Sequence, residues 1–223
     1  EKKMAITAAM VKELREMTSA GMMDCKKALT ETNGDMDAAV DVLKKSGAAK
    51  MEKKQSRIAA EGIARVAVNG NVAVVAEVNS ETDFVAKNET FQEFVQTVAD
   101  TALASDLNGG ANGEDIEALL ATNGLSDLLV EKTATIGEKL SVRRFAKVTG
   151  DAVASYIHGG GRIGVVIAAD GASDDAAKEA LTNIAMQVAA MNPQYISRND
   201  ISAEELAKIK EITIDSALND ATT

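Results

Sequence analysis

The chain has 223 residues, which is enough for one large domain or for two to three small ones with separate cores. Its formal net charge of −10 argues against a nucleic-acid-binding surface over the whole molecule, because phosphate backbones would be repelled. The single cysteine cannot form an internal disulfide, and no apolar run approaches the roughly 20 residues of a membrane span, so we expect a cytoplasmic protein without a membrane anchor.

Residues 1–47 predict a compact module of three short helices. Thr7 is placed to cap the first helix and Gly21 to end it. Residues 22–32 predict the second helix, and the third runs from Asp35 to Gly47. The apolar face of the first helix has helical spacing and consists of Met10, Val11, Leu14 and Met17.

Residues 48–60 are a charged, alanine-rich connector, where we expect the first domain boundary. Basic residues gather in and before it: Lys44, Lys45, Lys50, Lys53, Lys54 and Arg57. They form either a solvated surface or a local site for an acidic partner.

From Ile63 the apolar residues alternate, which predicts a β-hairpin with strands at 63–68 and 72–78 and a turn at 69–71. After a polar loop at 79–90, helical spacing returns at Phe91, Phe94, Val95, Val98 and Leu103. Residues 108–113 form a glycine-rich break, and a mostly helical stretch follows to Ile136. We assign residues 61–140 to the first half of an α+β core.

The second half of the core, residues 141–196, repeats this plan with a strand at 141–148, a hairpin at 153–168 and a helix at 174–191. Residues 72–76 resemble 163–167, and 94–99 resemble 184–189, which indicates internal duplication. Ser202 and Glu205 then predict a capping box for a last helix with Leu206, Ile209 and Ile212 on its apolar stripe. This stripe meets the core, another subunit or residues that are absent.

Two segments superficially resemble catalytic sites. Residues 158–161 (HGGG) resemble an oxyanion loop, but they lie between two strand-like runs and no G-x-S-x-G sequence is present, so a tight hairpin turn is favoured. Cys25 beside two lysines is either a reactive thiolate or a small buried helix residue, and the second is favoured. One cysteine and one histidine cannot supply a usual zinc ligand set, and we expect no cofactor, no metal and no direct nucleotide binding.

The loop at 80–88 carries one of only four phenylalanines. Phe84 either folds inward as a core residue or stands free beside Asp83 as a wedge for a partner's pocket. Met22 and Met23 are adjacent at a helix start, so at least one is expected at the surface.

Several segments in order resemble bacterial elongation factor Ts: 21–29 (GMMDCKKAL), 82–87 (TDFVAK), 136–138 (IGE), Arg143 with Arg144, and His158 followed by 162–164 (RIG). The resemblance departs at Gln187, where some relatives have histidine. It implies an exchange factor, not an enzyme of covalent chemistry, that releases GDP from the GTPase elongation factor Tu. The resemblance further implies that residues 1–47 are a ubiquitin-associated-like (UBA-like) domain. It also implies that residues 197–223 are only the start of a helical dimerisation module, truncated at its return, and that a homodimer is possible.

By position, the resemblance implies that Thr82, Asp83, Phe84 and Val85 displace Mg²⁺ from the partner. Further partner contacts are implied for Met22, Met23, Lys26, Arg15, Lys54, Ile136, Gly137 and His158. The alternative is a binding scaffold whose helical module recruits another protein, and a hydrolase is a distant third interpretation.

Overall fold

The computed structural model describes residues 5–171 and 173–219. Positions 1–4 and 220–223 of the predicted first and last modules, and Ala172 after the second hairpin, lie outside the described residues. The chain divides into the units Glu1–Ala189 and Ala190–Thr223, which are treated separately below. Across the two described ranges, no helix combines the length and apolar character needed to cross a bilayer.

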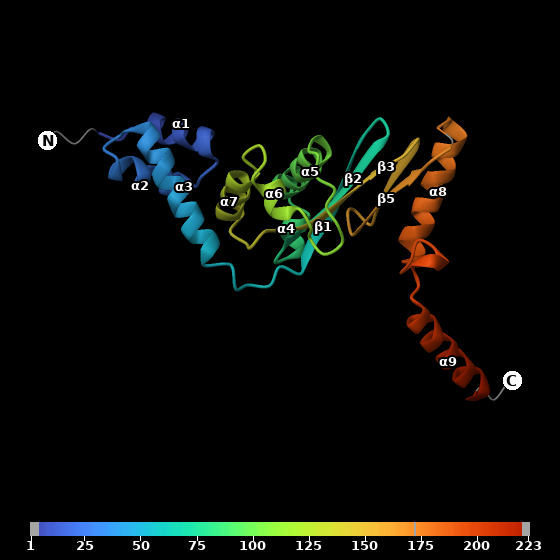
Figure 1. The fold of residues 1–223 in the computed structure, drawn as a ribbon. Coiled ribbons are helices and arrows are strands. Elements are labelled where there is room, and N and C mark those ends of the chain that lie inside the picture. Colours follow the sequence, from blue (N-terminus) through green and yellow to red (C-terminus); the bar gives the residue numbers. More distant parts are fainter. Residues whose placement is uncertain (1–4, 172, 220–223) are drawn as a thin grey trace. The chain divides into compact units, whose positions relative to one another are not determined.

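Three helices open the first unit: α1 (Ala8–Thr18), α2 (Met22–Glu31) and α3 (Met36–Glu52). The predicted caps are present, since Thr7 Oγ1 accepts from the Met10 amide at 3.3 Å and an Asp35 carboxylate oxygen accepts from the Ala38 amide at 2.9 Å. The three helices pack against one another (Figure 1). They share one small core, formed by Val11, Leu14, Cys25, Ala28, Leu29 and Ala39.

The expected helix end at Gly47 is wrong, because α3 continues to Glu52. Gly47 is buried where α3 crosses α7 (Leu125–Ile136), and a Cβ atom there would come 3.1 Å from Val130 Cγ1. This glycine therefore allows two helices to approach closely instead of ending one of them. The first residues of the predicted connector are accordingly helical.

A three-stranded antiparallel sheet has the order β1 (Glu61–Asn69), β2 (Val72–Ser80) and β3 (Ser141–Thr149). The β1–β2 hairpin is confirmed, and its turn places Gly70 at φ +58°. The strand expected to open the second half of the core is β3, yet it pairs with β2 of the first half. A strand's pattern predicts which face is buried but not which neighbour it joins, so this pairing was not foreseen.

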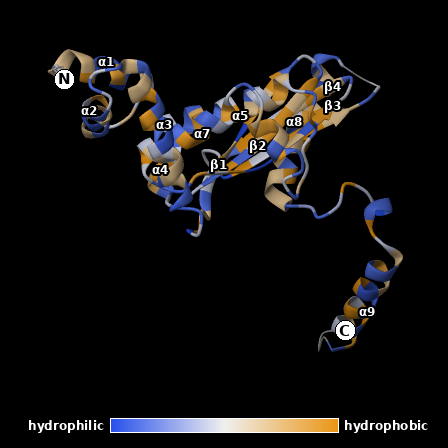
Figure 2. Cartoon of the chain, turned by 60° about the vertical axis from the view of Figure 1, so that its left-hand side comes forward, coloured by the Kyte–Doolittle hydropathy of each residue, from blue (hydrophilic) through white to orange (hydrophobic). Residues whose placement is uncertain are grey.

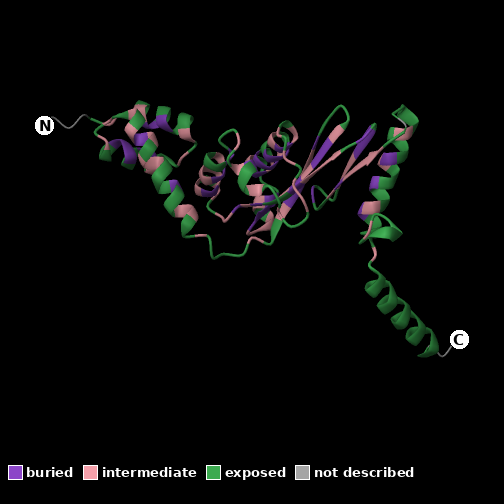
Figure 3. Ribbon diagram, in the orientation of Figure 1, coloured by how far each residue is buried: buried purple, intermediate pink, exposed green. Residues whose placement is uncertain are grey.

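Helices α4 (Asp83–Ala86), α5 (Glu89–Ala104), α6 (Ile116–Leu120) and α7 connect β2 to β3. The main core lies between α5 and the three-stranded sheet. Figure 3 shows buried residues, in purple, on both the helix and the strands. Phe91, Phe94 and Phe145 are its largest members and are at most 1% exposed. The expected helical spacing after residue 90 is thereby confirmed.

The second hairpin joins β4 (Ala152–His158) to β5 (Ile163–Ala169), and α8 (Asp175–Met191) follows it. Two small clusters attach α8 to this hairpin: Ala152, Ala154 and Leu181 in one, Val165, Ala185 and Ala189 in the other. The fold class is thus α+β, with N-terminal helices followed by antiparallel hairpins and packed helices.

The second unit contains a 3₁₀ turn at Arg198–Asp200 and α9 (Ala203–Asn219). Ser202 Oγ accepts from the Glu205 amide at 3.2 Å, as a cap should. The Glu205 carboxylate does not complete the expected capping box, because it instead accepts a hydrogen bond from the Tyr195 hydroxyl. Apolar residues recur along α9 in Figure 2, and no residue of this fully described helix is buried.

Candidate functional site

Phe84 lies on a single helical turn that leaves its ring in solvent. The turn is α4, which Thr82 caps through its Oγ1 and the Val85 amide at 3.4 Å. Val85 packs against the main core and Ala86 is buried, so these two residues attach the turn to the protein. Phe84 is 81% exposed. Of the two interpretations left open by the sequence, the structure therefore supports the free aromatic ring.

A charge pair flanks this ring. The Lys87 ammonium donates to an Asp83 carboxylate oxygen at 2.7 Å, from one end of the turn to the other. The hydrogen bond and charge of Lys87 hold the pKa of Asp83 below its ordinary value. Asp83 is consequently an anion at neutral pH, and it directly precedes Phe84 in the chain.

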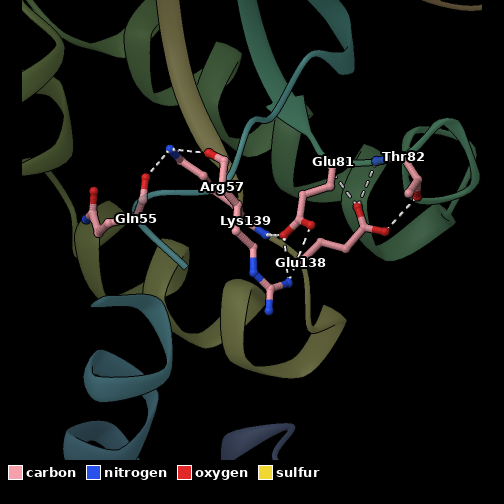
Figure 4. Close-up of polar contacts among 6 residues, drawn as sticks. All are labelled: Gln55, Arg57, Glu81, Thr82, Glu138 and Lys139. Atoms are coloured by element: carbon pink, nitrogen blue, oxygen red, sulfur yellow. Dashed lines mark hydrogen bonds and ion pairs between the residues drawn. The ribbon is translucent and has the colours of Figure 1, made fainter. Parts of the chain in front are cut away.

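The segment that leads into α4 is fastened by the carboxylate of Glu138 (Figure 4). One oxygen, Oε2, accepts from the backbone amides of Glu81 and Thr82, both at 3.0 Å. The other, Oε1, accepts from the Thr82 hydroxyl at 2.6 Å. A single side chain on the segment after α7 thus receives three hydrogen bonds from two adjacent residues before Phe84.

Lys139 extends this network toward the connector. Its backbone amide donates to Glu81 Oε1 at 2.6 Å, and its ammonium donates to the carbonyl oxygens of Gln55 and Arg57 at 2.6 and 2.9 Å. The Arg57 guanidinium pairs with Glu81 at 3.2 Å. The Lys139 amide, followed by Arg57, keeps the pKa of Glu81 below its ordinary value. Three segments distant in sequence are thereby joined at one point.

Ile136 and Gly137, two of the expected contact residues, lead into this network. Ile136 is half-buried and packs against the main core, whereas Gly137 is exposed and ends α7 at φ +86°. The Gly137 amide donates to the Thr133 carbonyl at 3.1 Å, after which the chain turns toward the loop. Glu138 therefore brings the 136–137 segment and the Phe84 loop together.

The helical module presents a second set of expected residues. Met22 and Met23 are 60% and 75% exposed at the start of α2, so both side chains reach the surface. Lys26 and Arg15 are exposed on α2 and α1. Lys54 is half-buried just beyond the end of α3. These residues lie on elements other than the Phe84 loop.

His158 is exposed at the end of β4, where its Nδ1 lies 3.0 Å from the Tyr156 hydroxyl. The glycines that follow have positive φ angles and connect β4 to β5. The prediction of a tight hairpin turn at this place is therefore confirmed. Cys25 is fully buried, and its burial raises the pKa of the thiol, which confirms the structural interpretation of this residue. Within the described ranges, acidic, cysteine and histidine side chains form no cluster suited to a metal ion.

Sequence reasoning did not assign a role to Glu81, Glu138 or Lys139. The hydrogen bonds of Glu138 to the loop span 56 and 57 residues, so no local periodicity could reveal them. The available signal was proximity in sequence, because Glu81 and Glu138 each directly adjoin an expected contact residue.

A family model described as elongation factor TS matches residues 81–222, which is more than half of the chain. The match begins at the loop that Glu138 fastens and includes both hairpin-associated helices α5 and α8. The matched range contains the motifs at residues 82–87, 136–138 and 162–164. The chain belongs to the elongation factor Ts family.

Proposed function

We propose that this chain is a guanine-nucleotide exchange factor that binds elongation factor Tu and promotes release of GDP during translation elongation. Family membership supports the role in translation. The observation that carries the finer proposal is Phe84, an aromatic residue that is 81% exposed and directly follows the anion Asp83. Such a large apolar side chain in solvent is suited to fill a pocket of another protein.

The proposed mechanism acts on the partner's metal site. Mg²⁺ needs nearly ideal octahedral oxygen geometry, so a small displacement of its surroundings weakens nucleotide binding. Phe84 enters an apolar pocket between helices of the GTPase, while Asp83 disturbs groups near the metal and phosphates. Burial of one such ring supplies about 1.5–3 kcal/mol, equivalent to roughly one to two orders of magnitude in nucleotide affinity.

One ring cannot account for complete exchange, so other contacts contribute docking energy. Besides Thr82 and Val85, the proposed docking residues are Met22, Met23, Lys26, Arg15, Lys54, Ile136, Gly137 and His158. Because linkage is reciprocal, GDP must weaken docking by the factor by which docking weakens GDP binding. No covalent bond changes, and the nucleotide and metal belong to the partner.

The domain division remains part of this proposal. Residues 1–47 form a docking module, 48–60 a connector, 61–140 and 141–196 the two core halves, and 197–223 the start of a dimerisation module. The proposed setting is the cytoplasm, where elongation takes place.

The test measures release of labelled GDP from elongation factor Tu with and without the chain. Phe84→Ala should slow release by about ten- to a hundredfold at saturating chain, with a smaller loss of docking affinity. The matched control is Ile184→Ala, which shortens an exposed apolar side chain on α8 outside the proposed surface and should release GDP at the wild-type rate.

Equal rates for Phe84→Ala and the control would refute the wedge. A chain that neither binds the GTPase nor speeds release would instead favour the scaffold that recruits another protein, for which the two exposed methionines of α2 are the best candidate surface.

A further inference from the structure

We propose that Glu138 is the positioning residue for Phe84: its carboxylate holds the α4 turn in the orientation from which the ring enters the partner. This inference rests on the proposed exchange function and assigns a role to a residue outside the expected contact set. It starts from the three hydrogen bonds that Glu138 receives from Glu81 and Thr82.

The α4 turn needs such a support because it is too short to be stable alone. A four-residue helix fixes its backbone at the cost of nucleation and gains few internal hydrogen bonds. On its inner side, Val85 and Ala86 contact the core, which fixes the depth of the turn. Apolar contacts are not directional, so they leave its rotation less well defined. Directional hydrogen bonds to a carboxylate can define that rotation.

Thr82 links the carboxylate to the turn itself. Its hydroxyl donates to Glu138 Oε1 at 2.6 Å and accepts from the Val85 amide at 3.4 Å. The same hydroxyl therefore caps α4 and attaches it to Glu138. In addition, Ser80 Oγ donates to the Thr82 carbonyl at 3.1 Å, which supports the same residue from the buried end of β2.

Glu138 is in turn held on both sides along the chain. Before it, Gly137 ends α7 in a left-handed conformation, so the direction of the next residue is set by a rigid helix. After it, Lys139 contacts Glu81 through its amide and the backbone of Gln55 and Arg57 through its ammonium. Through Glu138 and Lys139, the turn that carries Phe84 is thus attached both to α7 and to the connector.

A positioning role differs from a general structural role in what it changes. The methionines and His158 stand on other elements, so docking should survive loss of the Glu138 carboxylate. The rate at saturating chain should fall, because small misplacements of an acting group can cost up to about a hundredfold. The loss should also require Phe84, since Glu138 acts through that ring.

The experiment is a double-mutant cycle on the full chain with elongation factor Tu·GDP. Glu138→Ala should slow GDP release at saturation by roughly tenfold while docking affinity changes less than threefold. Glu138→Gln keeps an oxygen for the two backbone amides and should restore most of the rate. Glu117→Ala, which removes an exposed acid from α6, is the matched control and should match the wild type. In a Phe84→Ala background, Glu138→Ala should cost nothing further.

Amide hydrogen exchange on the chain alone supplies an independent measurement. The Glu81 and Thr82 amides, which donate to Glu138, should lose protection in Glu138→Ala and keep it in Glu117→Ala. Wild-type release rates for Glu138→Ala, or an equal additional loss in the Phe84→Ala background, would overturn the inference. If the wild-type chain does not speed GDP release, the exchange function fails, and protection of these two amides alone then decides whether Glu138 orders the turn.

Discussion

The Gly137→Ala variant should show two separate effects: a loss of stability from backbone strain and a slower release of GDP from the partner. Gly137 has φ +86°, and apart from its two neighbours along the chain no described residue has an atom within 4 Å of the position that a Cβ would take. The new methyl group therefore meets no residue distant along the chain, and the cost is that of a left-handed alanine. That cost is about 1–2 kcal/mol. For a protein of this size it should lower the melting temperature by about 2–8 °C.

Gly70→Ala is the matched control because Gly70 also has positive φ, +58°, with open space around its Cβ position. Urea unfolding followed by circular dichroism should show similar losses for both variants. Only Gly137 directly precedes Glu138, so only Gly137→Ala should also slow GDP release from elongation factor Tu at saturating chain. Wild-type stability of Gly137→Ala would refute the strain argument, and equal release rates for the two variants would refute the coupling to Glu138.

Three further predictions concern stability and reactivity. Phe94→Ala removes a ring that is 1% exposed from the main core and should lower the unfolding free energy by about 3–5 kcal/mol in urea titrations. The depressed pKa of Glu81 means that its contribution to stability is complete above its ordinary pKa of about 4.3 and is lost as pH falls through the lower folded value, so wild type and Glu81→Gln should converge in stability on acidification. Cys25, buried and with a raised pKa, should react with a thiol reagent only as fast as its module opens, and immediate labelling in the native state would contradict this burial.

Much of the fold follows from periodicity in the sequence. The helical spacing after Phe91 and the alternation from Ile63 predict α5 and the first hairpin, because each element buries one face. Two features escaped this reasoning for the same reason. The glycine at position 47 is explained by close packing against Val130, and the position of β3 in the sheet is explained by its pairing with β2. Both contacts join residues far apart in sequence.

The candidate site shows a similar division. The sequence singles out Phe84 as a rare aromatic residue in a polar loop, but a single turn such as α4 is too short to reveal by spacing which way the ring points. The orientation becomes interpretable only with Val85 and Ala86 on the inner side. The carboxylate of Glu138 is a long-range partner, so its place beside Ile136 and Gly137 in the sequence could draw attention to it, but its contact with the Phe84 loop appears only in the fold.

Comparison of the two hairpins suggests why Phe84 needs a separate support. In the second hairpin, an Asp151 carboxylate oxygen just before β4 accepts from the Gly171 amide after β5 at 2.8 Å. A carboxylate near the start of one strand thus holds the segment that follows its neighbour, as Glu138 does before β3. Among the described residues of the second segment, the Gly171 amide donates one such bond, and residues 170–171 include no aromatic side chain. In the first segment, Glu81 and Thr82 donate three bonds to Glu138, and Phe84 follows them. The additional fastening occurs where an apolar ring must stay in water until a partner takes it up, because a loosely held turn could bury that ring against its own core.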